Sequence, residues 1–181
     1  MIFEETSLKG SYIITPEPKG DERGWFARTF CKKEFEQIGH YKDWVQMNHS
    51  FSAESGTVRG LHFQLPPFGE IKMVRCISGS VFDVIVDIRK GSPTFLQWIG
   101  VELSAINKKM MYIPEGFAHG FQTIAENTEL IYHHSAFYEP QAESGLNMAD
   151  TLLNISWPKA ITAISDRDKH HQIITEHFKG I

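Results

Sequence analysis

Apolar and polar residues alternate with a period of two over most of the chain, in short runs that glycine and proline interrupt. Residues 58–87 show this pattern best. We predict that they form two strands joined by a proline turn, followed by a Ser-Gly turn and a third strand. Because alternate side chains of a strand share a face, Arg59 and Leu61 are expected on the face opposite to His62.

Similar runs fill most of the remaining sequence. The alternation predicts further strands over 8–18, 25–30, 44–52, 94–103, 108–113, 117–124 and 129–135. One helix is predicted over 32–38, with Gly39 as its stop, and beyond Pro140 the pattern loosens into loops. Many short strands between Gly and Pro turns are typical of a sandwich or barrel. We therefore expect one mainly β domain over residues 1–181, with short peripheral helices.

Composition and charge exclude several classes of protein. The 181 residues suffice for one domain with a substantial core, and 41% hydrophobic and 22% charged residues are ordinary for a globular protein. A formal net charge of -4 offers no basic surface to nucleic acid or anionic lipid. Cys31 and Cys76 are too few for a disulfide framework. Residues 1–6 lack the order of a signal peptide, and no apolar run approaches the roughly 18–20 residues of a membrane span. We expect a cytoplasmic protein with neither a nucleic-acid nor a membrane partner.

Polar residues stand at intervals in the otherwise apolar strands of 58–87, and two of them, His62 and Lys72, could carry chemistry. A histidine in a strand is more often a hydrogen-bonded structural residue than a catalyst. However, His62 has Arg59, Gln64 and Lys72 nearby, and buried polar groups are costly unless they are paired or used. A base (His62) and a cation (Lys72) on neighbouring strands could deprotonate carbon and hold the negative charge that results.

The turn at 114–119, Pro-Glu-Gly-Phe-Ala-His, is typical of small double-stranded β-barrels of the cupin type, where the histidine (here His119) points into the barrel. The alternative is a hairpin turn with an incidental histidine. Metal-binding cupins carry a His-x-His pair, a Glu and this later His. Here Gln64 replaces the second His of the pair, so that Glu70 would complete only a weak triad. We expect no metal.

Tyr132 and Asp168 gain a role only if the fold brings them to His62. A tyrosine in a strand is usually a packing residue, but Tyr132 could protonate the side opposite the base. Asp168 would be a solvated acid unless it folds back to hold the imidazole. The remaining histidines of this half of the chain show no partner and are interpreted as surface residues: His133, His134, His170 and His171.

Several segments form an ordered set that resembles one known family over most of the chain. They are residues 21–26, 46–50, 59–64, 72–76, 83–89, 91–94, 113–121 and 165–168, with Tyr132, Tyr138 and Glu143. The set resembles the dTDP-4-dehydrorhamnose 3,5-epimerase family. The resemblance implies a cupin-like double-stranded β-helix (jelly roll), a homodimer, and no metal or organic cofactor. It also implies a nucleotide-linked 4-keto-6-deoxy sugar as substrate.

By this resemblance His62 is the base, Asp168 its dyad partner and Lys72 the group that stabilises the enolate. Tyr132 is the acid that returns a proton to the opposite face. The ketone at C4 acidifies the hydrogens at C3 and C5, so that one base can serve both carbons. The residues expected to line the site or hold the nucleotide diphosphate are Arg23, Arg28, Gln46, Asn48, Arg59, His119, Tyr138, Glu143 and Arg167.

Two departures from the family pattern concern the substrate. Arg28 stands where members commonly have Glu, near the nucleotide, and residues 147–151 replace the usual Arg-Trp-Asp-Asp-Pro. The nucleotide, the keto-sugar and the number of carbons inverted therefore stay open. The alternatives are a mono-epimerase (C3 or C5 only) or an isomerase on a related keto-sugar, and a non-catalytic sugar-binding cupin. A full set of base, cation and acid counts against mere binding.

Overall fold

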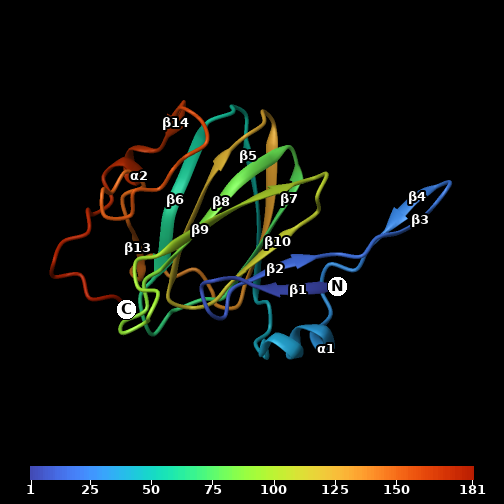
Figure 1. Ribbon diagram of the computed structural model, residues 1–181, viewed down its shortest axis with the longest axis horizontal. Helices are drawn as coiled ribbons and strands as arrows, with labels where there is room; N and C mark the ends of the chain where they lie inside the picture. The colour runs from blue at the N-terminus through green and yellow to red at the C-terminus, as the bar shows by residue number, and fades with distance from the viewer.

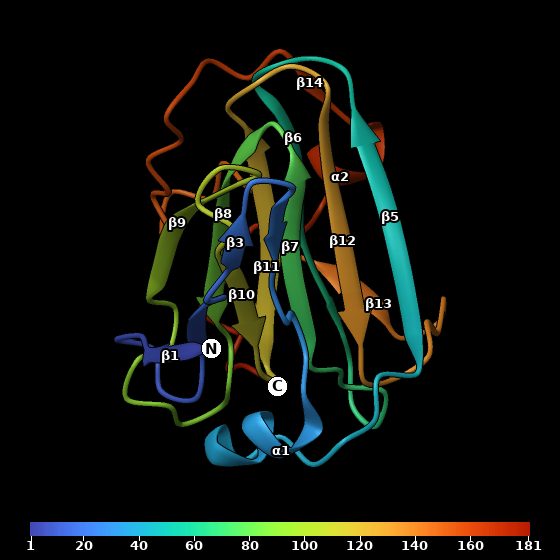
Figure 2. The ribbon, with the colours of Figure 1, turned by 90° about the vertical axis from the view of Figure 1, so that its right-hand side faces the viewer.

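Two antiparallel sheets pack face to face as a flattened barrel in the computed structural model, which describes residues 1–181 (Figure 1). The first sheet comprises, in spatial order, β1 (Ile2–Glu5), β2 (Tyr12–Thr15), β10 (Met110–Ile113), β7 (Lys72–Ser78), β12 (Thr128–His134) and β5 (Gln46–Ser52). The second comprises β13 (Glu143–Gly145), β6 (Thr57–Gln64), β11 (Phe117–Thr123), β8 (Ser80–Asp87) and β9 (Trp98–Ser104), with β14 (Ala163–Ile164) parallel to β6. Figure 2 shows β7, β12 and β5 side by side on the near side of the barrel. The predicted cupin-like fold is confirmed.

The main core lies between the sheets and follows from the alternation of apolar residues. Val74 and Leu130 from the first sheet are fully buried in one cluster with Val81, Ile85 and Phe121 from the second. Alternate side chains of a strand leave on opposite faces. Residues two apart share a face, so Lys72 lies on the same side of the first sheet as Val74, and Tyr132 on the same side as Leu130.

The predicted strands are present, with shifted bounds. The strand expected over 94–103 begins only at Trp98, because the hydroxyls of Ser92 and Thr94 both donate to Oδ2 of Asp87, 2.6 Å away, and hold the chain in a turn. The strand over 8–18 shortens to β2, and the strand predicted over 25–30 is wrong beyond Phe26, where the strand ends. The sequence pattern did not predict β1 and β13, which lie at sheet edges.

A bulge in β6 corrects the expected orientation of Arg59. His62 pairs with His119 and Arg59 pairs with Phe121. The two β6 residues are three positions apart in sequence, whereas their partners in β11 are two apart, so β6 contains one extra residue here. Arg59 and His62 consequently line the same cavity, whereas Leu61 is buried in the core. The bulge needs glycine at position 60: its φ is +120°, and a Cβ there would lie 2.5 Å from the Cα of Gly120.

Three short elements lie outside the barrel. The helix predicted over 32–38 is present as α1 (Lys32–Phe35) and the 3₁₀ turn η1 (Glu36–Ile38), which Gly39 ends with a φ of +76°. The hairpin of β3 (Lys19–Asp21) and β4 (Gly24–Phe26) projects away from the barrel (Figure 1). The single-turn helix α2 (Asp166–Lys169) lies against β6. None of the helices is long and apolar enough to span a membrane.

Candidate active site

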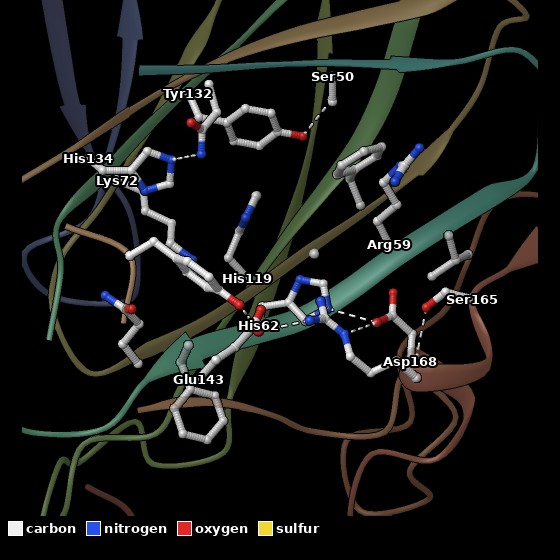
Figure 3. Close-up of a pocket in the computed structure, with 18 of the residues that line it drawn as sticks. Ser50, Arg59, His62, Lys72, His119, Tyr132, His134, Glu143, Ser165 and Asp168 are labelled. Atoms are coloured by element: carbon white, nitrogen blue, oxygen red, sulfur yellow. Dashed lines mark hydrogen bonds and ion pairs between the residues drawn. The ribbon is translucent and has the colours of Figure 1, made fainter. Parts of the chain in front are cut away.

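A cavity of about 720 Å³ opens between the sheets and collects most of the predicted site residues (Figure 3). All four predicted catalytic residues line it: His62, Lys72, Tyr132 and Asp168. So do six of the predicted substrate-binding residues: Asn48, Arg59, His119, Tyr138, Glu143 and Arg167. They come from both sheets, from α2 and, for Tyr138, from the loop between β12 and β13, which explains why their distances along the sequence are large.

His62 and Asp168 form a hydrogen-bonded dyad. Nε2 of His62 lies 2.8 Å from Oδ1 of Asp168, and the backbone N–H of Gly60 donates to Oδ2 of the same carboxylate at 3.0 Å. Burial acts to raise the pKa of Asp168, but these hydrogen bonds outweigh it and hold the pKa well below its ordinary value. The ionised carboxylate keeps a proton on Nε2. Nδ1 has no hydrogen-bond partner in the protein and is the nitrogen that can act as a base.

Tyr132 lies on the opposite wall of the cavity from His62, because β12 and β6 belong to different sheets (Figure 3). Its hydroxyl is 3.0 Å from Oγ of Ser50. Burial raises the pKa of Tyr132 to about 12, so that the phenol keeps its proton at neutral pH. It can therefore serve as an acid. His119 packs edge-on against its ring, 6.5 Å between centroids, and forms a buried pair with Asp83 at 2.8 Å.

Lys72 projects from β7 into the cavity beside a carboxylate that the pattern of strands did not reveal. Nζ of Lys72 lies 3.1 Å from Oε1 of Glu70, and Oε2 of Glu70 lies 2.6 Å from Nδ1 of His134. The interpretation of His134 as a surface residue is therefore wrong. One signal could have found it: His134 follows Tyr132 by two residues on the same strand, and so shares its face.

His171 is not a surface residue either: it packs against the His62–Asp168 dyad, although it does not line the cavity. Its Nε2 lies 3.5 Å from Oδ1 of Asp168, and its ring centroid is 5.4 Å from that of His62. Gly145 leaves the room for this ring, since a Cβ there would lie 2.5 Å from it. His62, Asp168 and His171 place three possible metal ligands within 4.8 Å of one another. Nε of Arg167 lies 3.7 Å from Oδ1 of Asp168, and the positive charge of its guanidinium would repel a metal cation bound there.

Of the other two histidines, His170 is exposed as predicted, whereas His133 is half-buried against Trp44. Neither lines the cavity.

Polar side chains at the cavity rim are tied to one another. Tyr138 donates its hydroxyl to Oε2 of Glu143 at 2.6 Å, and Arg167 donates Nη1 to the same oxygen at 2.7 Å. Arg59 donates to Oγ of Ser52 at 3.2 Å and to the carbonyl of Phe51 at 3.1 Å. Two guanidinium groups at one mouth suit the phosphate oxygens of a nucleotide.

Three predicted substrate-binding residues do not line the cavity of this chain. Arg23, with 84% of its side chain exposed, pairs with Asp21 on the projecting hairpin, and Arg28 pairs with Glu34 at 2.7 Å. Gln46 lies beside the rim, where its Nε2 donates to Oδ1 of Asn48. The altered residues 147–151 are also outside the cavity lining.

Comparison with known proteins places this geometry among sugar-nucleotide enzymes. The model of the family described as dTDP-4-dehydrorhamnose 3,5-epimerase matches residues 5–176. The protein of that name from Shigella flexneri is 46% identical over 93% of this chain and 93% of its own length. The crystal structure of the Bacillus anthracis protein of that name, with TDP and pyrophosphate bound, is 40% identical, with a TM-score of 0.93, over 96% of this chain and 99% of that one. ChmJ, a 3'-monoepimerase from Streptomyces bikiniensis, is 32% identical over 93% of this chain and 86% of its own, with a TM-score of 0.86 in a complex with dTDP-quinovose.

Proposed function

The chain belongs to the dTDP-4-dehydrorhamnose 3,5-epimerase family, and we propose that it inverts both C3 and C5 of a dTDP-linked 4-keto-6-deoxyhexose in this cavity. It is an isomerase that acts on a dTDP-linked keto-sugar. The observation that carries the proposal is the placement of a base and an acid on opposite walls, with an ammonium group in the same cavity. Proton removal from one face and return to the other inverts a carbon centre.

The first step is removal of a proton from the carbon next to the ketone. Nδ1 of His62 takes the proton, and the bonding electrons move to the carbonyl oxygen at C4 to form an enolate. The ammonium of Lys72 stabilises this oxygen where charge grows, which is where electrostatic stabilisation raises the rate. Asp168 holds the imidazole and stabilises the imidazolium that forms.

The second step is return of a proton to the opposite face. Tyr132 donates its phenol proton to the enolate carbon, and the carbonyl is restored. The tyrosinate then regains a proton from solvent, and His62 releases the one that it took. Because both carbons lie next to the same ketone, a shift of the ring presents the second carbon to the same groups.

We also propose roles for the polar residues at the mouth of the cavity. Arg59 and Arg167 would bind the diphosphate, since guanidinium groups pair with phosphate oxygens. Asn48, with Gln46 behind it, and the linked pair of Tyr138 and Glu143 would position the remainder of the substrate. His119 would pack behind Tyr132, to which its ring is adjacent.

A homodimer is part of the same proposal, and two surfaces support it. Met47 and Phe51 on the edge strand β5 are largely exposed, and Phe26, which pairs with Lys19 at the base of the projecting hairpin, is 77% exposed. Contiguous exposed apolar groups mark interaction surfaces. Arg23 on this hairpin and Arg28 just after it would then reach the cavity of the partner.

We place the enzyme, with its nucleotide-linked substrate, in the cytoplasm.

A mono-epimerase is the second candidate, because the chain is similar to ChmJ. The two differ in the number of carbons that exchange hydrogen with solvent. Incubation with dTDP-4-keto-6-deoxyglucose in heavy water, followed by NMR of the sugar ring, distinguishes them. Deuterium at both C3 and C5 supports the proposal, deuterium at one carbon supports the mono-epimerase, and none at either contradicts both.

A further inference from the structure

The ammonium of Lys72 is held by a buried carboxylate and imidazole to which the mechanism above gives no role. Glu70 divides its two oxygens between Lys72, at 3.1 Å, and Nδ1 of His134, at 2.6 Å. The exposed fractions of the three side chains are only 12% for Lys72, 9% for Glu70 and 11% for His134. Removing one partner of a buried charged pair is costly because it leaves the other charge uncompensated. Glu70 therefore fixes where the ammonium lies.

These hydrogen bonds continue to the cavity rim. Nε2 of His134 is 3.3 Å from Nδ2 of Asn48, and Oδ1 of Asn48 accepts from Nε2 of Gln46 at 3.3 Å. Oε1 of Gln46 in turn accepts from the backbone N–H of Tyr138 at 3.2 Å. The hydrogen bonds thus run without interruption from Tyr138 to Glu70, and the ion pair of Glu70 with Lys72 extends the connection to the ammonium.

In this series of hydrogen bonds, each group's role as donor or acceptor is determined by the role of the group next to it. The N–H of Tyr138 can only donate, so that Gln46 accepts with its oxygen and donates with its amide nitrogen. Asn48 then accepts with Oδ1 and donates to Nε2 of His134. The proton of the imidazole consequently lies on Nδ1, from which it is donated to Glu70.

His134 contacts the proposed acid as well. Its ring lies nearly parallel to that of Tyr132, with 6.2 Å between centroids and 24° between planes. The imidazole of His134 therefore contacts two groups: the Glu70 carboxylate, which pairs with Lys72, and the phenol ring of Tyr132, which is the proposed acid. Burial acts to raise the pKa of Glu70, but the hydrogen bond from His134 and the charge of Lys72 outweigh it and lower the pKa.

We propose that Glu70 and His134 are positioning residues that hold the Lys72 ammonium at the enolate oxygen, and that Asn48 and Gln46 link them to the nucleotide end of the cavity. The inference rests on the proposed function, in which Lys72 stabilises the enolate. A lysine has a flexible four-carbon stem, so that a fixed carboxylate is needed to aim it. Misplacement of a catalytic group by about 1 Å can cost about 10²-fold in rate. The loss should therefore appear in kcat rather than in KM.

The test compares Glu70→Gln with Glu129→Gln as a matched control. The control pair lies on β12 and β5, the strands that also carry His134 and Asn48. His49 on β5 and Glu129 on β12 form another His–Glu pair, 2.7 Å apart, but it is more exposed, with 51% and 35% of the two side chains accessible, and Glu129 lies outside the cavity. With dTDP-4-keto-6-deoxyglucose as substrate, we expect Glu70→Gln to lower kcat roughly 10- to 100-fold with KM changed less than about threefold. Glu129→Gln should leave both constants at the wild-type values.

Repeating Glu70→Gln in a Lys72→Met background separates positioning from a general structural effect. If Glu70 acts through Lys72, the second substitution causes no further loss of solvent deuterium exchange. An equal loss in both backgrounds would overturn the inference. If Glu70→Gln does not fold, as judged by its thermal melt, His134→Gln is tested in the same two backgrounds with the same expectation.

Two further outcomes distinguish this inference from the proposed function. A folded wild-type enzyme that exchanges deuterium, with Glu70→Gln at the same kcat, overturns the positioning role alone. A wild-type protein that exchanges nothing overturns the proposed function and the inference with it.

Discussion

Nε2 of His62 lies 2.8 Å from Oδ1 of Asp168, although 106 residues separate the two along the chain. The carboxylate also accepts the N–H of Gly60, which lies in the bulge between Arg59 and His62. A single carboxylate thus fixes both the tautomer of the imidazole and the backbone that carries it. Residues remote in sequence become one acid–base unit because α2 packs on β6.

Asp168→Asn tests this unit. The asparagine amide cannot hold Nε2–H as a carboxylate does, and it leaves the imidazolium unstabilised. We expect kcat to fall roughly 10²- to 10⁴-fold, with a smaller change in KM. Steady-state kinetics of the two purified proteins measure it. A kcat within threefold of the wild type would show that the carboxylate does not support the base.

Asp168 also predicts how stability changes with pH. Its pKa in the folded protein is below the value of about 3.9 for an unfolded chain. The folded state therefore binds fewer protons than the unfolded state between these two values, and stability falls as pH falls through them. The stabilisation is fully present above about pH 5 and is lost progressively below about pH 4.

The measurement is the difference in unfolding free energy between wild type and Asp168→Asn, from urea denaturation at pH 7, 5, 4 and 3. We expect this difference to be constant down to about pH 5 and to shrink at pH 4 and pH 3. A difference that is the same at pH 7 and pH 3 would exclude the dyad as its source.

Tyr132→Phe should separate hydrogen exchange from inversion. The base on the other wall is untouched, so that deuterium from heavy water still enters the sugar from the side of His62. No acid remains on the far face, and the configuration at the exchanged carbon should be retained. Proton NMR of the recovered sugar reads both properties at once. Inversion at the wild-type rate in this variant would assign the acid to another group.

Mixing two inactive variants tests the proposed dimer. If Arg23 acts in the cavity of the partner, a heterodimer of Arg23→Ala and His62→Ala contains one cavity with both changes and one with neither. Random association of equal amounts then restores roughly a quarter of the wild-type sites. Co-expression with two different tags yields the mixture. If Arg23 instead acts in its own chain, no activity returns.

The limits of sequence-based prediction are local and physical. Period-two alternation placed β6, β7 and β8 correctly. It assigned Arg59 to the wrong face, since one bulge at Gly60 shifts the register. Alternation carries no information on what a loop residue contacts, so that Glu70 was not recognised as the partner of Lys72 and His134.

Resemblance supplied what periodicity could not. Nothing in the pattern around Asp168 shows that it returns to His62, and only the family likeness predicted that pairing. For Arg23 and Arg28 the likeness predicted a place at the substrate, whereas the single chain places both away from its own cavity. The partner subunit of the proposed dimer is the source that would supply them.

The central claim is that His62 removes the protons at C3 and C5 of a nucleotide-linked 4-keto-sugar. The most direct measurement is NMR of dTDP-4-keto-6-deoxyglucose after incubation in heavy water with wild type and with His62→Ala, the fold of both being checked by circular dichroism. We predict deuterium at both carbons with wild type and at neither with His62→Ala. Exchange by His62→Ala at the wild-type rate, or its absence with wild type, would contradict the claim.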